Sequence, residues 1–296
     1  MATVDRAAAD GFEPHRRHLT GLAYRMLGSL AEAEDAVQEA YLRWHKTDQA
    51  KVTNARAFLS KTVTRLCLDQ LKSARARRES YVGPWLPEPL VEEAGLAAGE
   101  SAGDLAHDLS VALLLALERL SPLERAAFLL HDVFDMDFAA VAETLGRSEA
   151  ACRQLAARAR EHVGAARPRF PVRPDEGARL AEAFLAAVQS GDAAALGRLL
   201  AADATLHSDG GGKKRAALNV LHGRDRIAAF FAGVVRKQAA AITAIRVRPA
   251  RINGLPGFVT VEPGGTVQTI ALEIAGAEIA AIYIVRNPDK LRHVPA

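Results

Sequence analysis

The sequence predicts a multidomain protein with two all-α domains followed by a C-terminal α+β domain. Its 296 residues are enough for two or three domains. Helix-forming stretches occupy 10–79 and 108–168, and between them lies 80–107, an acidic segment interrupted by three prolines. From 175 to 296 two helical stretches give way to glycine-rich turns and β-branched runs. We therefore expect two helical domains joined by a linker, and then the α+β domain.

Composition places the chain among ordinary globular proteins, with 49% hydrophobic and 25% charged residues. No apolar run approaches the roughly 18–20 residues of a membrane span, and the N-terminus lacks the apolar core of a secretory signal. Two cysteines, Cys67 and Cys152, make no disulfide framework, and no Cys/His cluster indicates a metal. These features predict a cytoplasmic protein with no membrane association, metal or cofactor. The net charge of +3 is too small to imply nucleic acid, so the position of the charges matters.

The stretch 30–44 is predicted to be an amphipathic helix with an acidic side. Its buried stripe recurs at helical spacing and comprises Leu30, Ala33, Val37, Tyr41 and Trp44. Glu32, Asp35 and Glu39 lie on another side. Spacing alone leaves open whether this acidic face is simply solvated or binds a partner.

A second predicted helix, 55–79, carries a basic ridge. The ridge consists of Lys61, Arg65, Lys72, Arg75, Arg77 and Arg78. Such a ridge can neutralise phosphates, the interaction that dominates non-specific nucleic-acid affinity. Solvation of the charges is the alternative at this point.

The sequence 137–161 predicts a helix-turn-helix. Ser121, Pro122 and Glu124 start the preceding helix as N-cap, first residue and capping-box partner. Gly146 fits the left-handed position that ends a short helix, and Ser148 can cap the next one.

The second helix of this motif presents side chains suited to reading DNA. Arginine and glutamine offer paired donors to guanine and adenine edges. The residues on or beside its free side are Arg147, Ser148, Glu149, Arg153, Gln154 and Arg158. A helix-turn-helix can be purely structural, but the basic surroundings favour DNA binding.

In order, these pieces resemble the extracytoplasmic-function sigma factors of bacterial RNA polymerase. AEDAVQEAYLRW (33–44) resembles the region 2 helix that binds the clamp of the core enzyme, and 55–79 resembles the segment that reads the −10 element. The stretch 117–161 resembles region 4, which reads the −35 element. The resemblance implies that Asp35, Gln38 and Glu39 bind core polymerase, that the basic ridge binds −10 DNA, and that the residues on the second helix of 137–161 bind −35 DNA. Region 2 would span 10–79 and region 4 108–168.

The rest of the chain is similar to the subgroup of these factors with a fused C-terminal SnoaL-like domain, a cone-shaped α+β fold. The motifs are YVGPWLPEP (81–89), DGGGK (209–213) and NPDKL (287–291), with HGRDRIAAFF (222–231) as a strand end entering a helix. The resemblance implies a regulatory domain at 175–296 that contacts the sigma core in cis. The implied regulatory residues are Tyr81, Trp85, Asp209, Gly210, Gly211, Gly212, Lys213, Asn287, Pro288, Asp289, Lys290 and Leu291.

We therefore expect a sigma factor, not an enzyme, whose partners are core RNA polymerase and promoter DNA. We further expect the three motifs to form one contact system, because Tyr81 and Trp85 stand in a segment too short to bury them. The alternatives are a helix-turn-helix regulator with a ligand-sensing domain, or an isomerase or cyclase fused to a DNA-binding region. The candidate acid–base groups for an enzyme are His207, Asp209, His222 and Asp225. No motif supports a small-molecule ligand.

Overall fold

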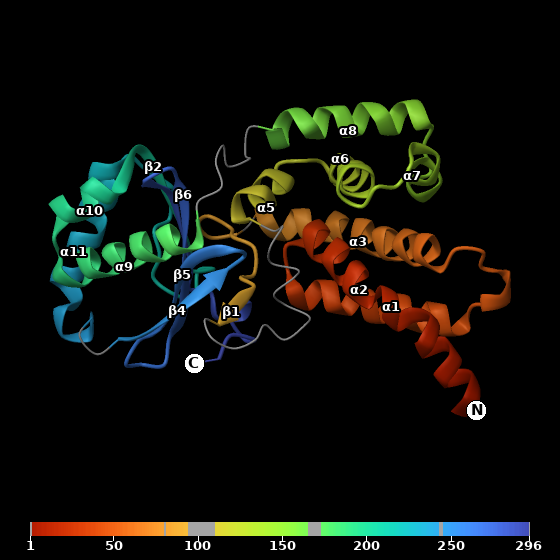
Figure 1. The fold of residues 1–296 in the computed structure, drawn as a ribbon, viewed down its shortest axis with the longest axis horizontal. Helices are drawn as coiled ribbons and strands as arrows, with labels where there is room; N and C mark the ends of the chain where they lie inside the picture. The colour runs from red at the N-terminus through yellow and green to blue at the C-terminus, as the bar shows by residue number, and fades with distance from the viewer. Residues whose placement is uncertain (1, 80, 94–109, 165–172, 243–244, 296) are drawn as a thin grey trace. The chain divides into compact units, whose positions relative to one another are not determined.

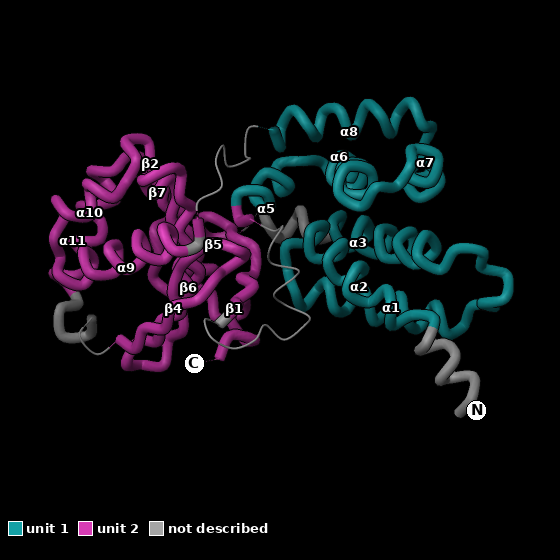
Figure 2. The backbone as a smooth tube through the Cα atoms, in the orientation of Figure 1, with its two compact units in different colours: residues 1–79, 112–167 teal, residues 80–111, 168–296 magenta. Residues whose placement is uncertain are grey.

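The computed structural model describes residues 2–79, 81–93, 110–164, 173–242 and 245–295 (Figure 1). Side chains are described for all of these except 2–10, 73–79, 93, 174 and 238–242. The chain forms two compact units (Figure 2), of which the first comprises 1–79 and 112–167 and the second 80–111 and 168–296.

Helices make up the described part of the first unit. Its N-terminal half contains α1 (Ala2–Leu27), α2 (Leu30–Lys46), the short η1 (Gln49–Lys51) and α3 (Ala55–Glu79). Its C-terminal half contains α5 (Val111–Glu118), α6 (Pro122–Phe128), the π-helical η2 (Leu129–Val133), α7 (Phe138–Leu145) and α8 (Glu149–Gly164).

Local sequence sets several of these helix ends, as predicted. Ser121 and Glu124 form a reciprocal capping box at the start of α6. Gly146 ends α7 with a left-handed φ of 63°, and the hydroxyl of Ser148 accepts the Ala151 amide at the start of α8. The helix-turn-helix is therefore confirmed as α7, a three-residue turn and α8.

The two helical stretches share one unit, whereas the sequence predicted separate domains. Helix α3 packs against α6 and α7. The guanidinium of Arg125, 2% exposed, donates to the carbonyl of Met26 in α1 and to the Glu118 carboxylate at 2.8 Å. A buried cation needs such acceptors, so Arg125 ties the halves together.

The second unit is an α+β domain with a seven-stranded sheet, and this confirms the predicted fold class. The strand order is β1-β4-β5-β6-β7-β2-β3, and only β2 and β7 pair in parallel. The strands are β1 (Val91–Glu93), β2 (Leu200–Asp209), β3 (Leu221–His222), β4 (Arg246–Ile252), β5 (Leu255–Val261), β6 (Val267–Ala275) and β7 (Glu278–Val285).

One face of this sheet carries the main core. Alternate residues such as Leu206, Phe258 and Ile282 pack against α9 (Pro174–Ser190), α10 (Ala193–Leu199) and α11 (Arg224–Ile242). Helix α11 runs to Ile242, so the strand predicted over 241–248 was wrong at its start and begins only at Arg246.

Part of the predicted linker belongs to the second unit. Strand β1 extends the sheet by pairing with β4, so 91–93 is sheet rather than free connector. Asn253 and Gly254, both with positive φ (49° and 74°), form the two-residue turn between β4 and β5. The segment 94–107 of the predicted linker lies outside the described residues.

Candidate functional sites

The acidic face of α2 is open to solvent. Asp35 and Gln38 are exposed, while Ala33, Val37 and Trp44 are buried on the opposite side as the spacing predicted. The Glu39 carboxylate accepts from Arg43 at 2.9 Å, one turn further along the helix. The face thus offers two unburied polar side chains and one carboxylate in an exposed, easily exchanged ion pair.

Two members of the basic ridge on α3 contact the C-terminal half of the first unit. The Lys61 ammonium lies 2.6 Å from the Glu143 carboxylate in α7 and holds the pKa of that carboxyl below its ordinary value. The Arg65 guanidinium donates to the main-chain carbonyls of Thr144 and Glu143 at 3.2 and 3.4 Å. Lys61 and Arg65 therefore bind the C-terminal end of α7 here.

Among the other members of the basic ridge, only the side chain of Lys72 is described. Lys72 is exposed and pairs with Asp69 at 2.8 Å on the same helix. The side chains of Arg75, Arg77 and Arg78 lie outside the described set.

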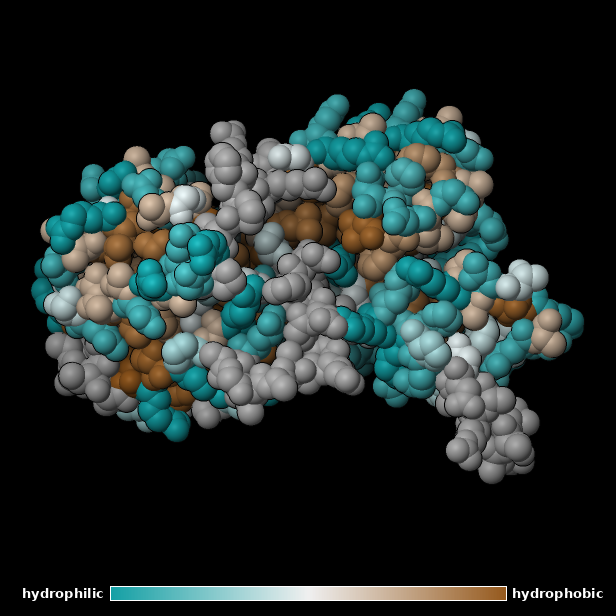
Figure 3. Space-filling model, viewed as in Figure 1, coloured by the Kyte–Doolittle hydropathy of each residue, from teal (hydrophilic) through white to brown (hydrophobic). Residues whose placement is uncertain are grey.

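The free side of α8 holds its predicted residues in the open. Arg147, Ser148, Glu149, Gln154 and Arg158 are all exposed. Figure 3 shows mostly hydrophilic side chains over α8 on the face drawn. An exposed polar helix of this kind can enter the major groove of DNA.

One arginine on α8 is positioned by two neighbours. The Arg153 guanidinium lies 2.6 Å from the Glu149 carboxylate and 5.0 Å from the centre of the Phe138 ring. Both contacts limit its rotamers, so its donors have a restricted direction.

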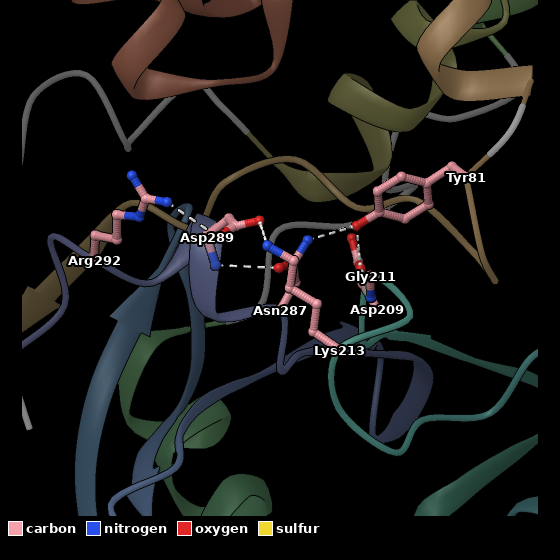
Figure 4. A network of polar contacts seen from close by, with 7 residues as sticks. All are labelled: Tyr81, Asp209, Gly211, Lys213, Asn287, Asp289 and Arg292. Carbon is pink, nitrogen blue, oxygen red and sulfur yellow. Dashed lines mark hydrogen bonds and ion pairs between the residues drawn. The ribbon is translucent and has the colours of Figure 1, made fainter.

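In the second unit the buried carboxylate of Asp209 binds the start of the predicted linker. Asp209, fully buried at the end of β2, accepts from the Tyr81 hydroxyl at 2.6 Å (Figure 4). It also accepts from the Leu86 amide at 2.9 Å and from the Gly211 amide at 3.0 Å. Burial, and then the bond to Asp209, raises the pKa of Tyr81 well above its ordinary value. Tyr81 is therefore a neutral hydroxyl donor at physiological pH.

A buried ammonium complements this carboxylate. Lys290, 8% exposed, lies 2.8 Å from Asp209 and donates to the Leu86 carbonyl. Its nitrogen lies 4.2 Å from the centre of the Trp85 ring and 5.0 Å from that of the Tyr81 ring. The two rings flank a desolvated cation, an arrangement in which cation–π attraction is strongest.

The glycines of DGGGK allow a close approach to the C-terminal tail. A Cβ on Gly211, whose φ is +58°, would lie 2.3 Å from Nδ2 of Asn287. That nitrogen donates to the Tyr81 hydroxyl at 2.8 Å, so the loop, the tail and the linker meet at one point. Lys213 and Asp289 pair with each other nearby.

Two residues that hold the linker escaped the sequence reasoning. The side-chain Oδ1 of Asn253 accepts from the main-chain amide of Leu90 at 3.1 Å, and the main-chain amide of Asn253 donates to the Leu90 carbonyl at 2.8 Å. Nε2 of His293 contacts the Pro89 carbonyl at 2.8 Å. The Asn-Gly pair at 253–254 signals a hairpin turn, but nothing local indicates that its amide binds a distant segment. We call the contacts of 81–90 with Asp209, Asn253, Asn287, Lys290 and His293 the linker dock.

The second unit also contains a partly open cavity of about 120 Å³ between the sheet and the helices α9 and α11. None of His207, Asp209, His222 and Asp225, the acid–base candidates, is among its lining residues. In β2 and the strand beside it side chains alternate, so His207 and Asp209 point to the opposite face. In the described chain no group of three His, Cys, Asp or Glu is placed to hold a metal, and no helix has the length and apolarity to cross a membrane.

Comparison with known proteins assigns three parts of the chain to families. The Sigma-70 region 2 family matches residues 12–77, the Sigma-70 region 4 family 110–163, and the SnoaL-like domain family 181–286. The ECF RNA polymerase sigma factor SigJ of Mycobacterium tuberculosis is 38% identical over 96% of this chain and 93% of its own length. The chain belongs to the extracytoplasmic-function sigma factors. It directs RNA polymerase to promoters in transcription initiation.

Other relatives agree over the full length of this sigma factor. SigI from Mycobacterium tuberculosis, described as a probable ECF RNA polymerase sigma factor, is 31% identical over 98% of this chain and 97% of its own. The crystal structure of Mycobacterium tuberculosis SigJ superposes with a TM-score of 0.79 at 36% identity, covering 97% of this chain and 99% of that one. The predicted family, with its two sigma regions and SnoaL-like domain, is therefore confirmed.

Proposed function

We propose that the SnoaL-like domain modulates this sigma factor in cis by holding the segment that follows region 2. The observation that carries the proposal is the buried Asp209–Lys290 pair with Tyr81, Trp85 and Leu86 gathered around it. The held segment is the start of the connection between region 2 and region 4. Docking it shortens the free connection, and this limits the separations that the two promoter-reading regions can adopt.

The proposal assigns separate surfaces to the two established partners. Asp35, Gln38 and Glu39 of α2 bind basic side chains of core polymerase. The exposed residues of α8 read −35 DNA, with Arg153 and Gln154 at base edges. The α3 ridge binds −10 DNA, for which Lys61 and Arg65 must leave Glu143 and Thr144. The Lys61 contact is exposed and the Arg65 contact is part-buried, and we propose that both exchange for DNA phosphates.

Transcription in vitro with core polymerase tests the regulatory part. Lys290→Met leaves Asp209 buried without its cation and releases the linker, whereas Lys214→Met removes an exposed lysine that bonds only the Thr266 hydroxyl in the described contacts. We expect Lys290→Met to change promoter-specific transcript yield and Lys214→Met to leave it unchanged. An increase identifies the dock as inhibitory and a decrease identifies it as activating.

Truncation gives an independent measurement. Chains ending near residues 286, 204 and 168 remove the NPDKL tail, the DGGGK loop and the whole domain in turn. Equal yields from all three and from the full chain would contradict control in cis.

A further inference from the structure

The cavity of the SnoaL-like domain has an apolar body. Its walls include Leu185 and Val188 of α9, Phe231 and Val234 of α11, and Ile270 of β6. At about 120 Å³ it approaches the roughly 150 Å³ of a cavity that holds benzene. A molecule of about one ring therefore fits.

One end of the cavity is polar, and two of its polar atoms lack a partner. The Thr260 hydroxyl is on a residue 3% exposed and makes no hydrogen bond. Nε of Arg286 is likewise buried and unpaired. Both residues line the cavity. An unsatisfied buried donor is costly in a folded protein, so two at the end of one cavity indicate a ligand that completes them.

The charge at this end selects the ligand. The Arg286 guanidinium already pairs with the Glu262 carboxylate and donates to the Arg215 carbonyl at 2.9 Å. A second carboxylate would gain little from a neutralised cation and would be repelled by Glu262. A neutral oxygen can accept from Nε–H and also from the threonine hydroxyl.

The polar end is built from the segments that hold the linker. Arg286 directly precedes Asn287, and its side chain faces the cavity while Asn287 faces Tyr81 on the other side. Arg215, whose carbonyl Arg286 binds, follows the DGGGK loop in sequence. The amides of Arg286 and Asn287 both donate to the main-chain carbonyl of Asp209, at 2.7 and 3.0 Å.

We propose that this cavity binds a small, neutral, mostly apolar molecule of about one ring with a carbonyl or hydroxyl oxygen, and that the bound molecule strengthens the linker dock. An oxygen bonded to Nε restrains the backbone at 286–287, and this favours the Asn287–Tyr81 contact. The second half of the proposal rests on the proposed control in cis, whereas the first half does not.

The affinities of three probe molecules for the full-length protein, measured by calorimetry, test the site. Cyclohexanone is expected to bind more tightly than toluene, which has no oxygen, and than benzoate, which is charged. Thr260→Val keeps the side-chain shape and should weaken cyclohexanone about three- to tenfold without weakening toluene. Val234→Phe fills the cavity and should abolish binding of both.

Three results would overturn the site. They are absence of saturable cyclohexanone binding to the wild type, equal cyclohexanone affinity in Thr260→Val, and tighter binding of benzoate. The phenylalanine variant controls for binding elsewhere on the chain, and the valine variant, which removes only an unpaired hydroxyl, keeps the test independent of folding defects.

Hydrogen exchange of the same full-length protein tests the coupling. The Leu86 and Leu90 amides are bonded to Asp209 and Asn253, so their exchange reports on the dock. Saturating cyclohexanone should slow exchange across 81–90 in the wild type but not in Val234→Phe. Unchanged exchange despite saturation would overturn the coupling even if cis control stands. Slowed exchange without any change in transcription would instead count against cis control.

Discussion

The ion pairs at the candidate binding surfaces of the sigma unit and the ion pair of the linker dock differ in exposure. The side chains of Arg153 and Glu149 are 56% and 46% exposed, and the Lys61–Glu143 pair joins a side chain that is 27% exposed to one that is 74% exposed. In the linker dock of the SnoaL-like unit, the side chains of Asp209 and Lys290 are 0% and 10% exposed. Exposed pairs contribute little and exchange easily, whereas breaking a buried pair strands a charge. The proposed polymerase- and DNA-binding residues can therefore exchange partners more easily than the residues of the linker dock.

Removing the buried carboxylate should have the largest effect. Asp209→Ala leaves Lys290 buried without an anion and should cost the SnoaL-like unit about 3–5 kcal/mol in free energy of unfolding. Asp289→Ala, at an exposed pair of the same tail, should cost less than about 1 kcal/mol. Urea unfolding of both variants measures this. Equal losses would show that burial does not separate the two kinds of contact.

Reversing the acidic face should abolish a partner interaction without unfolding the chain. Asp35→Arg with Glu39→Arg places like charges against basic side chains of core polymerase, a cost of about several kcal/mol. Glu176→Arg with Glu182→Arg makes the same change in charge at exposed positions of α9 in the second unit and should bind normally. Co-purification with core polymerase measures both, together with circular dichroism. Wild-type affinity in the first variant would remove α2 from the polymerase interface.

The recognition helix should show an effect that depends on DNA sequence. Arg153→Ala should reduce discrimination at one −35 base by about 1–3 kcal/mol. Arg75→Ala should instead weaken binding to all sequences alike and flatten its salt dependence. Salt titrations on matched and mismatched promoters distinguish the two. Identical behaviour would contradict the division between base-reading and phosphate-binding residues.

A half-buried histidine, His18, makes the sigma unit sensitive to acid. Burial above all, and then the nearby Arg56, lower the pKa of His18 from 6.5 to about 4. Between pH 6.5 and about pH 4, His18 is protonated in the unfolded chain but neutral in the folded chain. The free energy of unfolding should therefore fall as the pH drops from 6.5 towards 4.

The surroundings of His18 provide the control for that prediction. Arg56 can only donate to Nδ1, at 3.4 Å, which leaves Nε2–H to donate to the Ser60 hydroxyl at 3.0 Å. His18→Gln keeps a donor but cannot titrate in this range. Unfolding of the sigma unit at about pH 7.5 and about pH 5 should therefore differ less in this variant. An undiminished pH dependence would assign it to other groups.

The smallest effect concerns the exposed contact between α3 and α7. Glu143→Gln removes the partner of Lys61 and should leave the free energy of unfolding nearly unchanged, because the Glu143 carboxylate is exposed. Because it frees a cation of the ridge, −10 DNA affinity should rise slightly. Filter binding at low salt measures this. A loss of stability as large as that of Asp209→Ala would show that this exposed pair behaves like the buried one.

Local sequence decided the elements whose contacts are close in the chain. The capping box at Ser121 and Glu124, the left-handed Gly146 and the buried stripe of α2 could all be predicted, because each depends on residues within one or two turns. The end of α11 was misjudged because β-branched residues at 241–248 favour a strand, whereas the helix continues to Ile242 and the strand begins at Arg246.

For the candidate sites, too, local sequence identified residues but not the contacts between distant ones. Motifs brought Tyr81, Asp209, Asn287 and Lys290 to attention, but their geometry depends on partners 128 residues apart for Tyr81–Asp209 and 81 for Asp209–Lys290. A lysine in a tail reads as a surface charge. Only the fold desolvates it, by placing a carboxylate at the end of β2 and two rings from the linker around one ammonium. Sequence alone thus determined the family and the helix ends that depend on local capping residues. The tertiary structure decided which charges are buried, because the cost of burying a charge depends on neighbours that are distant in the chain.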